Sequence, residues 1–373
     1  MRWVFWGAVA LIVYAYAGYP GWLWLRSRWR PLPVRREAIE PIVSIVMVVR
    51  NEEQVLPTKI NNLLGIDYPT DRMELVIVSD GSTDHTESIL HGYARNPRVR
   101  IVMNQLSRGK ASGLNDALQV IQGEIVVLTD ARQKLEQDAL RVLVQDFADS
   151  QVGCVSGELM LGGAQQGQTS NGMGLYWRIE KRVRELESAS GSVVGATGGF
   201  YGVRRELMGF VPPEILLDDV YVPMRVVRAG KRVIFEPRAR AWDLPDQGTG
   251  REFSRKVRTL SGNYQLLQLA PWLLTSANPI RFEFISHKLV RLAVPFALVA
   301  ALVAAMFLQQ PIYRIALVVQ LAFYALSLMA MMRLKRGLVA GAADAAFTFV
   351  LLNTAAVVAF ANFVLGRKAA WSR

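Results

Sequence analysis

Cysteine and histidine are scarce in this sequence. Its 373 residues include one cysteine, Cys154, and three histidines. A single cysteine excludes a disulfide within the chain and fits a reducing compartment, and we interpret Cys154 as a small core residue. His85 and His91 lie six residues apart on one predicted helix, and His287 stands in a basic segment. This spacing is not that of a metal site and favours solvated or packing roles for the histidines.

Charge is absent from residues 3–25, in a chain that has 43 Lys and Arg against 31 Asp and Glu. The uncharged run is long enough to span a bilayer, and tryptophans stand near both of its ends. Only Arg2 precedes it while several arginines follow, which favours an uncleaved anchor with its N-terminus outside. A cleavable signal peptide is the alternative interpretation, because Ala15-Tyr16-Ala17 resembles a cleavage site.

Long hydrophobic runs return in the last quarter of the chain. Leu289 to Leu308 and Ile315 to Met332 are predicted to span the membrane. Leu338 to Leu365 is too long for one straight span and too short for a hairpin; an interfacial segment leading into a span would fit, and its topology is left open. Basic residues flank these runs, which predicts a multi-pass protein that contacts membrane lipids. The sequence has no nucleic-acid-binding motif, so nucleic acid is excluded as a partner.

Between the hydrophobic ends, short apolar runs alternate with amphipathic stretches, the pattern of βαβ units. The predicted domains are an anchor at 1–25, a basic linker at 26–40, an α/β domain at 41–285 that ends in an interfacial segment, and a membrane region at 286–373 with two or three spans. Its first four strands are predicted at 43–49, 74–80, 99–103 and 124–128, with helices at 55–64, 84–94 and 110–121.

The second half of the α/β domain is less regular. We predict a helix at 136–148, a strand at 153–161, a flexible loop at 162–171, a helix at 174–188, a helix at 220–229 and a strand at 231–237. The small residues of Gly195 to Phe200 suit either close backbone approach to a ligand or tight packing. After a basic stretch, Gly262 is predicted to close a turn.

Polar residues follow the predicted strands. In open α/β sheets, ligands bind at this edge. A nucleotide diphosphate needs polar partners for its base and ribose, a cation for its phosphates, and often a metal ion held by carboxylates. Transfer of its attached group to a hydroxyl needs a general base, and a carboxylate can serve. The candidates for these groups are Asp80, Lys110, Asp130 and the pair Asp218-Asp219, and Asn51 and Glu52 lie in a loop at the same edge. Turn formation and helix capping are the ordinary alternatives for the aspartates.

These motifs, in this order, resemble those of the membrane-bound family 2 glycosyltransferases. That family has the GT-A fold, an α/β architecture with a Rossmann-like mixed sheet, and builds bacterial exopolysaccharides, hyaluronan-like and cellulose-like polymers and lipid-linked sugars. The resemblance rests on Val43 to Glu53, Asp80 to Asp84, Gly109-Lys110-Ala111 with Leu114-Asn115, the strand ending at Asp130, and Asp218-Asp219.

The resemblance implies an inverting transferase of the bacterial inner membrane with a cytoplasmic catalytic domain. Its donor is expected to be a nucleotide sugar, most often a UDP-sugar, and its acceptor a surface glycan or a polyprenyl-linked sugar, with envelope-assembly proteins as further partners. Asp219 is expected to be the general base, with Asp218 beside it. The expected nucleotide-sugar ligands are Asn51, Glu52, Asp80, Lys110, Asp130 and Arg132. Thr197, Gly198 and Arg258 are expected to contact the acceptor or the diphosphate.

Three departures from the family pattern bear on these expectations. Asp130-Ala131-Arg132 replaces Asp-x-Asp, so Asp130 alone matches the metal-binding acids. Either another ligand completes the shell of Mg²⁺ or Mn²⁺, or Arg132 neutralises the diphosphate directly. The stretch 255–259 keeps an arginine but lacks the Gln and Trp of polymerising members, and Arg50 replaces a common Tyr. A catalytically silent nucleotide-binding subunit of an envelope assembly is therefore the alternative function; a transporter is disfavoured because three or four spans leave little room for a pathway.

Overall fold

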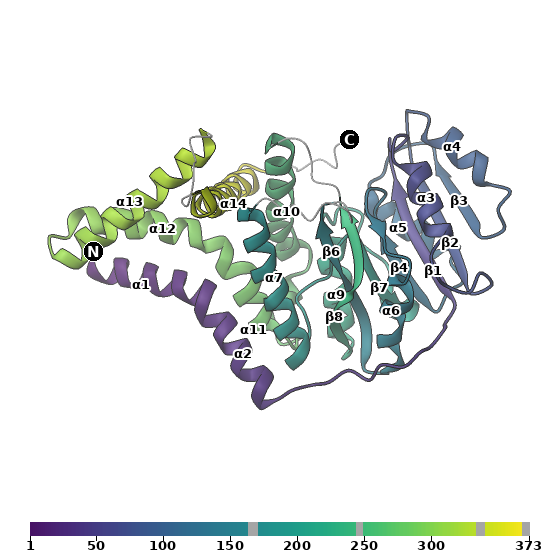
Figure 1. Ribbon diagram of the computed structural model, residues 1–373, viewed down its shortest axis with the longest axis horizontal. Helices are drawn as coiled ribbons and strands as arrows, with labels where there is room; N and C mark the ends of the chain where they lie inside the picture. Colours follow the sequence, from purple (N-terminus) through teal and green to yellow (C-terminus); the bar gives the residue numbers. More distant parts are fainter. Residues whose placement is uncertain (163–170, 244–248, 333–339, 368–373) are drawn as a thin grey trace.

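The protein has an α/β part and a helical part that lie side by side (Figure 1). The computed structural model describes residues 1–162, 171–243, 249–332 and 340–367. The predicted loop at 162–171 falls almost entirely outside these ranges. The strands are β1 (Val43–Val49), β2 (Met73–Asp80), β3 (Val99–Asn104), β4 (Ile125–Thr129), β5 (Lys134–Leu135), β6 (Val152–Leu161), β7 (Phe200–Arg204) and β8 (Arg232–Asp243).

One mixed sheet organises the α/β part. Its strand order is β3-β2-β1-β4-β7-β6-β8-β5. The first four strands are parallel, as their apolar sequences predict, while β7 runs antiparallel between β4 and β6. Strand β1 lies between β2 and β4, so β2 lies on one side of β1 and β4 on its other side. The carboxyl ends of these three strands therefore meet where ligands bind in such sheets.

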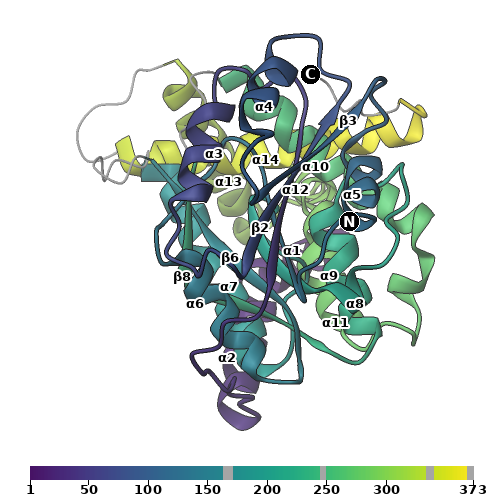
Figure 2. The same ribbon diagram turned by 90° about the vertical axis from the view of Figure 1, so that its right-hand side faces the viewer.

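Both faces of the sheet are buried. Alternate residues of β1 point to opposite faces, so that Ile45 and Met47 enter one hydrophobic cluster while Val46 and Val48 enter the other. Figure 2 shows helices α3 and α6 on one side of the sheet and α5 and α9 on the other. The helices of this part are α3 (Leu56–Leu64), α4 (Thr86–Tyr93), α5 (Lys110–Leu118), α6 (Ala139–Gln145), α7 (Asn171–Ser190), α8 (Arg205–Met208), α9 (Asp218–Arg228) and α10 (Thr249–Leu269).

Helix α10 corrects one prediction. Gly262 was expected to close a turn, but it lies inside α10, where a Cβ atom would stand 2.6 Å from Leu217 Cγ. Glycine is tolerated in the middle of this helix because it lets the helix pack closely against the residue before Asp218. The basic stretch is therefore part of a continuous helix beside the acid pair.

Within the described ranges, four helices are long and apolar enough to cross a membrane: Arg2–Trp29, Arg281–Phe307, Pro311–Met331 and Ala340–Val364. They comprise α1 (Arg2–Val13) and α2 (Tyr19–Trp29), joined through the π-helical Tyr14–Gly18; α11 (Arg281–Phe284), π-helical Ile285–Leu289 and α12 (Val290–Phe307); α13 (Pro311–Met331); and α14 (Ala340–Val364). Many of their outward side chains are apolar, as a lipid surface requires.

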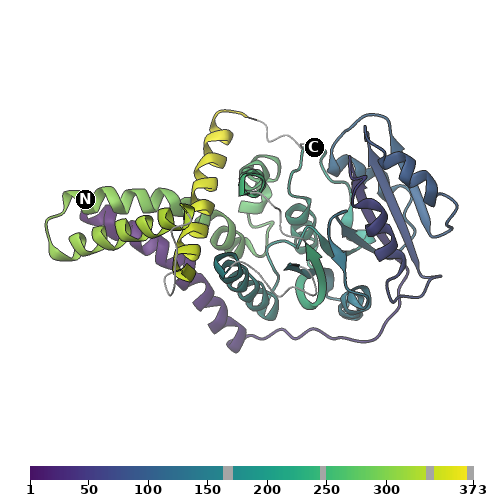
Figure 3. The same ribbon diagram turned by 45° about the horizontal axis from the view of Figure 1, so that its top comes forward.

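Helix α14 is a single helix in the segment whose topology the sequence left open. Its bounds, Ala340–Val364, cover most of the run predicted at 338–365. Figure 3 shows α1, α12 and α13 running alongside one another, while α14 crosses them steeply and lies beside the α/β part. This orientation agrees with an interfacial segment.

Candidate functional site

Asp80 ends strand β2 and organises the loop that leads into α5. Its buried carboxylate accepts hydrogen bonds from Ser107 Oγ at 2.8 Å, the Arg108 amide at 2.8 Å and the Gly109 amide at 2.9 Å. Gly81 follows with φ +62°, and a Cβ atom there would lie 2.5 Å from the Ser107 nitrogen. The turn therefore requires glycine. In this structure the carboxylate of Asp80 contacts the loop, and a direct contact to the nucleotide stays a prediction.

Lys110 is the first residue of α5 and joins two further strand and helix ends. Its Nζ donates to Asp130 Oδ1 at 2.9 Å and lies 3.4 Å from Asp218 Oδ2. Burial disfavours the charged ammonium, but the carboxylates of Asp130 and Asp218 outweigh it and raise the pKa of Lys110 above its ordinary value. The structure thus brings together three residues that lie far apart in the sequence.

The acid pair begins helix α9. The residue before it, Leu217, forms no side-chain capping hydrogen bond. Asp218 is buried and accepts a hydrogen bond from the Tyr201 hydroxyl at 3.3 Å. Burial and the charge of Asp218 raise the pKa of Asp219 to about 6, while the positive charges of Lys110 and Lys288 oppose the rise. Both acids stand in the first turn of α9, where negative charge stabilises a helix, and the raised pKa of Asp219 in addition suits a general base.

Thr197 and Gly198 lie directly beside Asp219. The Ala196 amide donates to the Asp219 carbonyl at 2.7 Å, which fixes the loop against the start of α9. A Cβ atom on Gly198 would lie 2.9 Å from Asp219 Oδ2. The absence of a side chain at Gly198 therefore keeps one face of this carboxylate uncovered.

Asn51 and Glu52 follow strand β1 and lie against the loop after β2. Asn51 has φ +54°, and its Oδ1 accepts hydrogen bonds from the Thr83 amide at 2.8 Å and the Thr83 hydroxyl at 3.3 Å. The Glu52 amide donates to Thr86 Oγ1 at 2.9 Å. These contacts hold together the two loops that the sequence predicted to receive the nucleotide.

The two predicted arginines occupy different surroundings. Arg132 is exposed in the loop after β4, and its charge acts on Asp243. Arg258 is half-buried inside α10. Their predicted contacts to the diphosphate or the acceptor stay predictions.

Oxygen donors beside Asp130 fit a divalent cation. Strands β5 and β8 pair antiparallel with Lys134 opposite Trp242, a register that sets Gln133 across from Asp243. Both side chains are buried, and in the described part of the chain Gln133 Oε1 and Asp243 Oδ1 have no hydrogen-bond partner. Carboxylate and amide oxygens suit Mg²⁺ or Mn²⁺. The described residues contain no cluster of three or more His, Cys, Asp and Glu, so the fit depends on an amide oxygen as well.

The site therefore joins a cationic lysine, a metal-type donor set and a basic carboxylate at one sheet edge. Residues 44–209 match the sequence profile of the family described as Glycosyl transferase family 2. The chain carries a family 2 glycosyltransferase domain. The expected α/β fold of the GT-A type is confirmed, and the family match agrees with the expected enzyme class.

Two curated relatives are similar to this chain over about 60% of its length. The poly-beta-1,6-N-acetyl-D-glucosamine synthase of Staphylococcus epidermidis is 24% identical over 238 residues, which cover 62% of this chain and 56% of the relative. The synthase of the same name from Staphylococcus aureus (strain COL) is 24% identical over 233 residues, 60% of this chain and 55% of the relative. The chain thus matches little more than half the length of these relatives.

A solved structure resembles the family 2 domain together with the candidate membrane-spanning helices. The mannosyltransferase PcManGT from Pyrobaculum calidifontis, in complex with GDP-Man and Mn²⁺, superimposes with a TM-score of 0.77 at 24% identity. The match covers 96% of this chain and 98% of that chain. The similarity in fold therefore covers both the α/β part and the helical part of the molecule.

Sequence reasoning missed several residues of the family 2 domain. Tyr201 and Asp243 reach the site through strands β7 and β8, whose pairing with distant partners has no local signal. Lys59 is buried beneath the Asp130 loop, where its Nζ donates to Thr129 Oγ1 at 2.8 Å and to the Gln133 carbonyl at 2.5 Å. Burial lowers the pKa of Lys59 to about 7, against the charge of Asp130.

Proposed function

We propose that this protein is an inverting glycosyltransferase that moves a sugar from a nucleotide sugar to a hydroxyl of a surface glycan or a lipid-linked acceptor. The observation that carries the proposal is the Asp219 carboxylate, which lies beside the unsubstituted Gly198 and has a pKa raised to about 6. A base with this proton affinity, open on one side, is suited to an acceptor hydroxyl.

The donor occupies the carboxyl edge of β1, β2 and β4 in this proposal. Asn51, Glu52 and the loop organised by Asp80 receive the nucleotide, while Lys110 and Arg132 face the diphosphate. We expect a UDP-sugar from the family resemblance. The structural relative from Pyrobaculum calidifontis was solved with GDP-Man, so GDP-mannose is the second donor to test.

A divalent cation, when bound, neutralises charge on the diphosphate. Asp130 would hold it, and Asp243 and Gln133 are the further oxygen donors that replace the missing second acid of the motif. The structural relative solved with Mn²⁺ supports this choice of ion.

Transfer follows as one displacement. The acceptor oxygen bonds to the anomeric carbon as the bond from that carbon to the diphosphate oxygen breaks. Asp219 takes the hydroxyl proton, and the nucleoside diphosphate leaves. Asp218 raises the proton affinity of Asp219, and Thr197 and Gly198 bound the space through which the acceptor approaches. The four candidate spans support placement in a bacterial inner membrane, with the α/β part in the cytoplasm.

Nucleotide release tests the proposal. Purified protein in native lipid extract is given a panel of UDP- and GDP-sugars with Mg²⁺, Mn²⁺ or chelator. We expect release from one donor, reduced about 10³-fold in Asp219→Asn, as loss of a general base predicts. Nucleotide affinity should be unchanged. Asp138→Asn, an exposed acid at the start of α6 without a capping bond, is the matched control.

A second candidate function is a silent nucleotide-binding subunit of an envelope assembly. It is favoured by Arg132, which replaces the second acid of the metal motif. Binding of nucleotide without release from any donor, and a partner's activity that is unaffected by Asp219→Asn, would select this candidate over the enzyme.

A further inference from the structure

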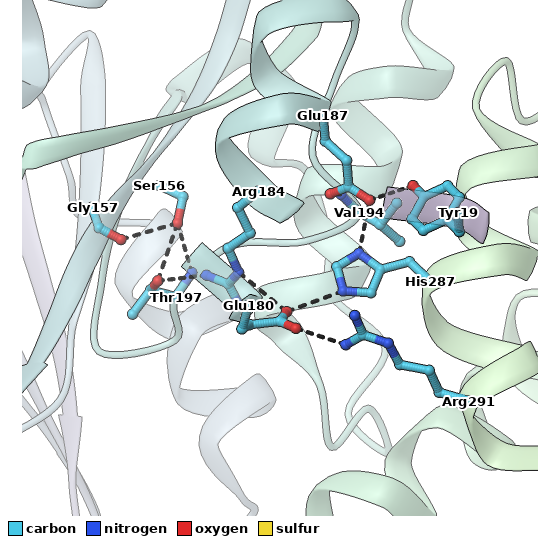
Figure 4. A network of polar contacts seen from close by, with 10 residues as sticks. All are labelled: Tyr19, Ser156, Gly157, Glu180, Arg184, Glu187, Val194, Thr197, His287 and Arg291. Carbon is cyan, nitrogen blue, oxygen red and sulfur yellow. Dashed lines mark hydrogen bonds and ion pairs between the residues drawn. The ribbon is translucent and has the colours of Figure 1, made fainter. Parts of the chain in front are cut away.

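A buried polar network joins the membrane helices to the loop beside Asp219 (Figure 4). His287, in the π-helical turn before α12, is 4% exposed. Its Nδ1 lies 2.7 Å from Glu187 Oε1 and its Nε2 lies 3.0 Å from Glu180 Oε1. One imidazole thus contacts two carboxylates of helix α7. Burying a charged group costs desolvation free energy, so buried charged groups need partners such as these.

The carboxylates on α7 have further partners in the membrane helices. Arg291 Nη1 donates to Glu180 Oε2 at 2.7 Å, and the Tyr19 hydroxyl of α2 donates to Glu187 Oε1 at 2.6 Å. Burial opposes ionisation, but His287 and Arg291 hold the pKa of Glu180 well below its usual value. Glu180 is therefore a fixed negative charge at the boundary between the two parts.

The same face of α7 extends to residues 194–198, the acceptor loop. Glu180, Arg184 and Glu187 are spaced four and three residues apart, so their side chains share one side of the helix. Arg184 Nε lies 3.6 Å from Glu180 Oε1, and its Nη1 donates to Thr197 Oγ1 at 2.8 Å. Figure 4 shows Arg184 between Glu180 and Thr197.

Strand β6 and this face of α7 both hold the acceptor loop. Ser156 Oγ of strand β6 accepts from the Thr197 amide at 2.9 Å and also contacts Thr197 Oγ1 at 3.2 Å. The Val194 amide donates to Glu187 Oε2 at 3.4 Å. Because the Ala196 amide bonds the Asp219 carbonyl, the position of this loop relative to Asp219 depends on partners that the membrane helices fix.

We propose that His287 and Arg184 are positioning residues that couple the membrane helices to the acceptor side of the site. His287 fixes Glu180, Glu180 orients Arg184, and Arg184 holds Thr197 beside Asp219. This inference rests on the proposed function for the meaning of the loop, but the coupling itself is a property of the contacts. The docking of α7 on the membrane helices then adds to the order that Ser156 and the Asp219 carbonyl give the acceptor loop.

Hydrogen exchange of the full-length protein in lipid nanodiscs tests the coupling without requiring activity. We expect exchange of the Ala196 and Thr197 amides to rise about tenfold in His287→Ala and in Arg184→Met, as loss of a hydrogen bond to a charged group predicts. The double variant should exchange no faster than Arg184→Met alone, because both changes break one chain of contacts. Arg182→Met is the matched control, since Arg182 is exposed and pairs only with Glu185 within the described residues.

Kinetics supply the second readout. The two variants should raise the acceptor KM about tenfold while the donor KM and nucleotide affinity stay within about twofold of the wild type. Arg184→Lys, which keeps the charge, should recover part of the acceptor affinity.

Three outcomes decide the matter. Unchanged exchange and acceptor KM in folded His287→Ala, even with a lower melting temperature, would reduce the network to a structural clamp and overturn the inference. If His287→Ala does not fold, Thr197→Val breaks the far end of the network at nearly constant volume, and unchanged exchange of the Ala196 amide overturns the inference. A wild type that transfers no sugar refutes the proposed function, whereas the exchange experiment still decides the coupling.

Discussion

Lys110 Nζ lies 2.9 Å from Asp130 Oδ1 and 3.4 Å from Asp218 Oδ2, so one ammonium group ties the end of β4 to the first residue of α9. In the proposed function, the nucleotide side and the acceptor side of the site would share this cation. A substitution at this position should affect both donor binding and the proton affinity of the acid pair.

Lys110→Met should weaken the donor and shift the pH profile of transfer. In the wild type, activity should fall as the pH drops through about 6, because protonated Asp219 cannot accept a proton. Lys110 opposes the raised pKa of Asp219, so its removal should move the acidic limb to higher pH. The pH dependence of kcat and the donor KM are the measurements, with the exposed Lys134→Met as control. A limb that stays in place would contradict the coupling.

Gly198→Ala should lower the transfer rate about 100-fold, the effect expected when a reacting group is displaced by about 1 Å. The added Cβ would lie 2.9 Å from Asp219 Oδ2 and would cover the uncovered face of the carboxylate. Steady-state rates and a thermal melt are compared with Gly92→Ala, because a Cβ at Gly92 meets nothing within 4 Å. Equal rates in both variants would mean that the acceptor approaches from another side.

Asp243→Asn should weaken Mn²⁺ binding about tenfold or more, because it removes the only further carboxylate proposed for the ion beside Asp130. Calorimetric titration of Mn²⁺ in the presence of nucleotide measures this affinity independently of turnover. The control is Glu136→Gln, whose parent carboxylate accepts the Trp242 indole hydrogen bond at 2.8 Å on the same strand pair. Unaltered Mn²⁺ affinity would mean that another residue is the second ligand, or that Arg132 neutralises the diphosphate directly in place of a second metal acid.

The prediction of the fold from sequence succeeded where local signals are strong. Apolar runs ending in polar turns predicted β1 to β4, and β1, β2 and β4 are almost continuously apolar because both of their faces are buried. From the strand ends, Asp80, Lys110 and Asp130 were predicted to lie at one edge of the sheet. Strand β7 and the reach of Asp243 could not be predicted, because they depend on pairing between segments distant in sequence. Gly262 was wrongly taken as a turn because its packing partner, Leu217, lies on another element.

His287 illustrates the same limit at the site. In the sequence it is one isolated histidine in a basic segment, whereas in the structure Glu180 and Glu187 enclose it. A signal did exist on the partner helix, where acidic and basic residues recur with helical spacing on one face. That pattern indicates a polar face but not which group it contacts.

Lys59 predicts a pH dependence of stability. Its pKa is about 7 in the folded protein against an ordinary 10.5, so between these values the unfolded chain binds more protons. The free energy of unfolding should therefore increase as the pH rises from about 7 towards 10. Lys59→Met should remove this contribution, which denaturant titrations of both proteins at about pH 7 and about pH 9 can measure. A parallel pH dependence in the two proteins would assign it to other groups.

The steep crossing of α14 over α1, α12 and α13 bears on how many times the chain passes through the bilayer. With α14 flat at the surface, the number of crossings is odd, and the polypeptide following Val364 emerges on the side that holds the catalytic domain. An upright α14 would make the number even and place that segment on the opposite side. A protease-cleavable tag after Val364 in inside-out and right-side-out vesicles distinguishes the two orientations. The result therefore tells whether α14 lies along one leaflet or crosses both.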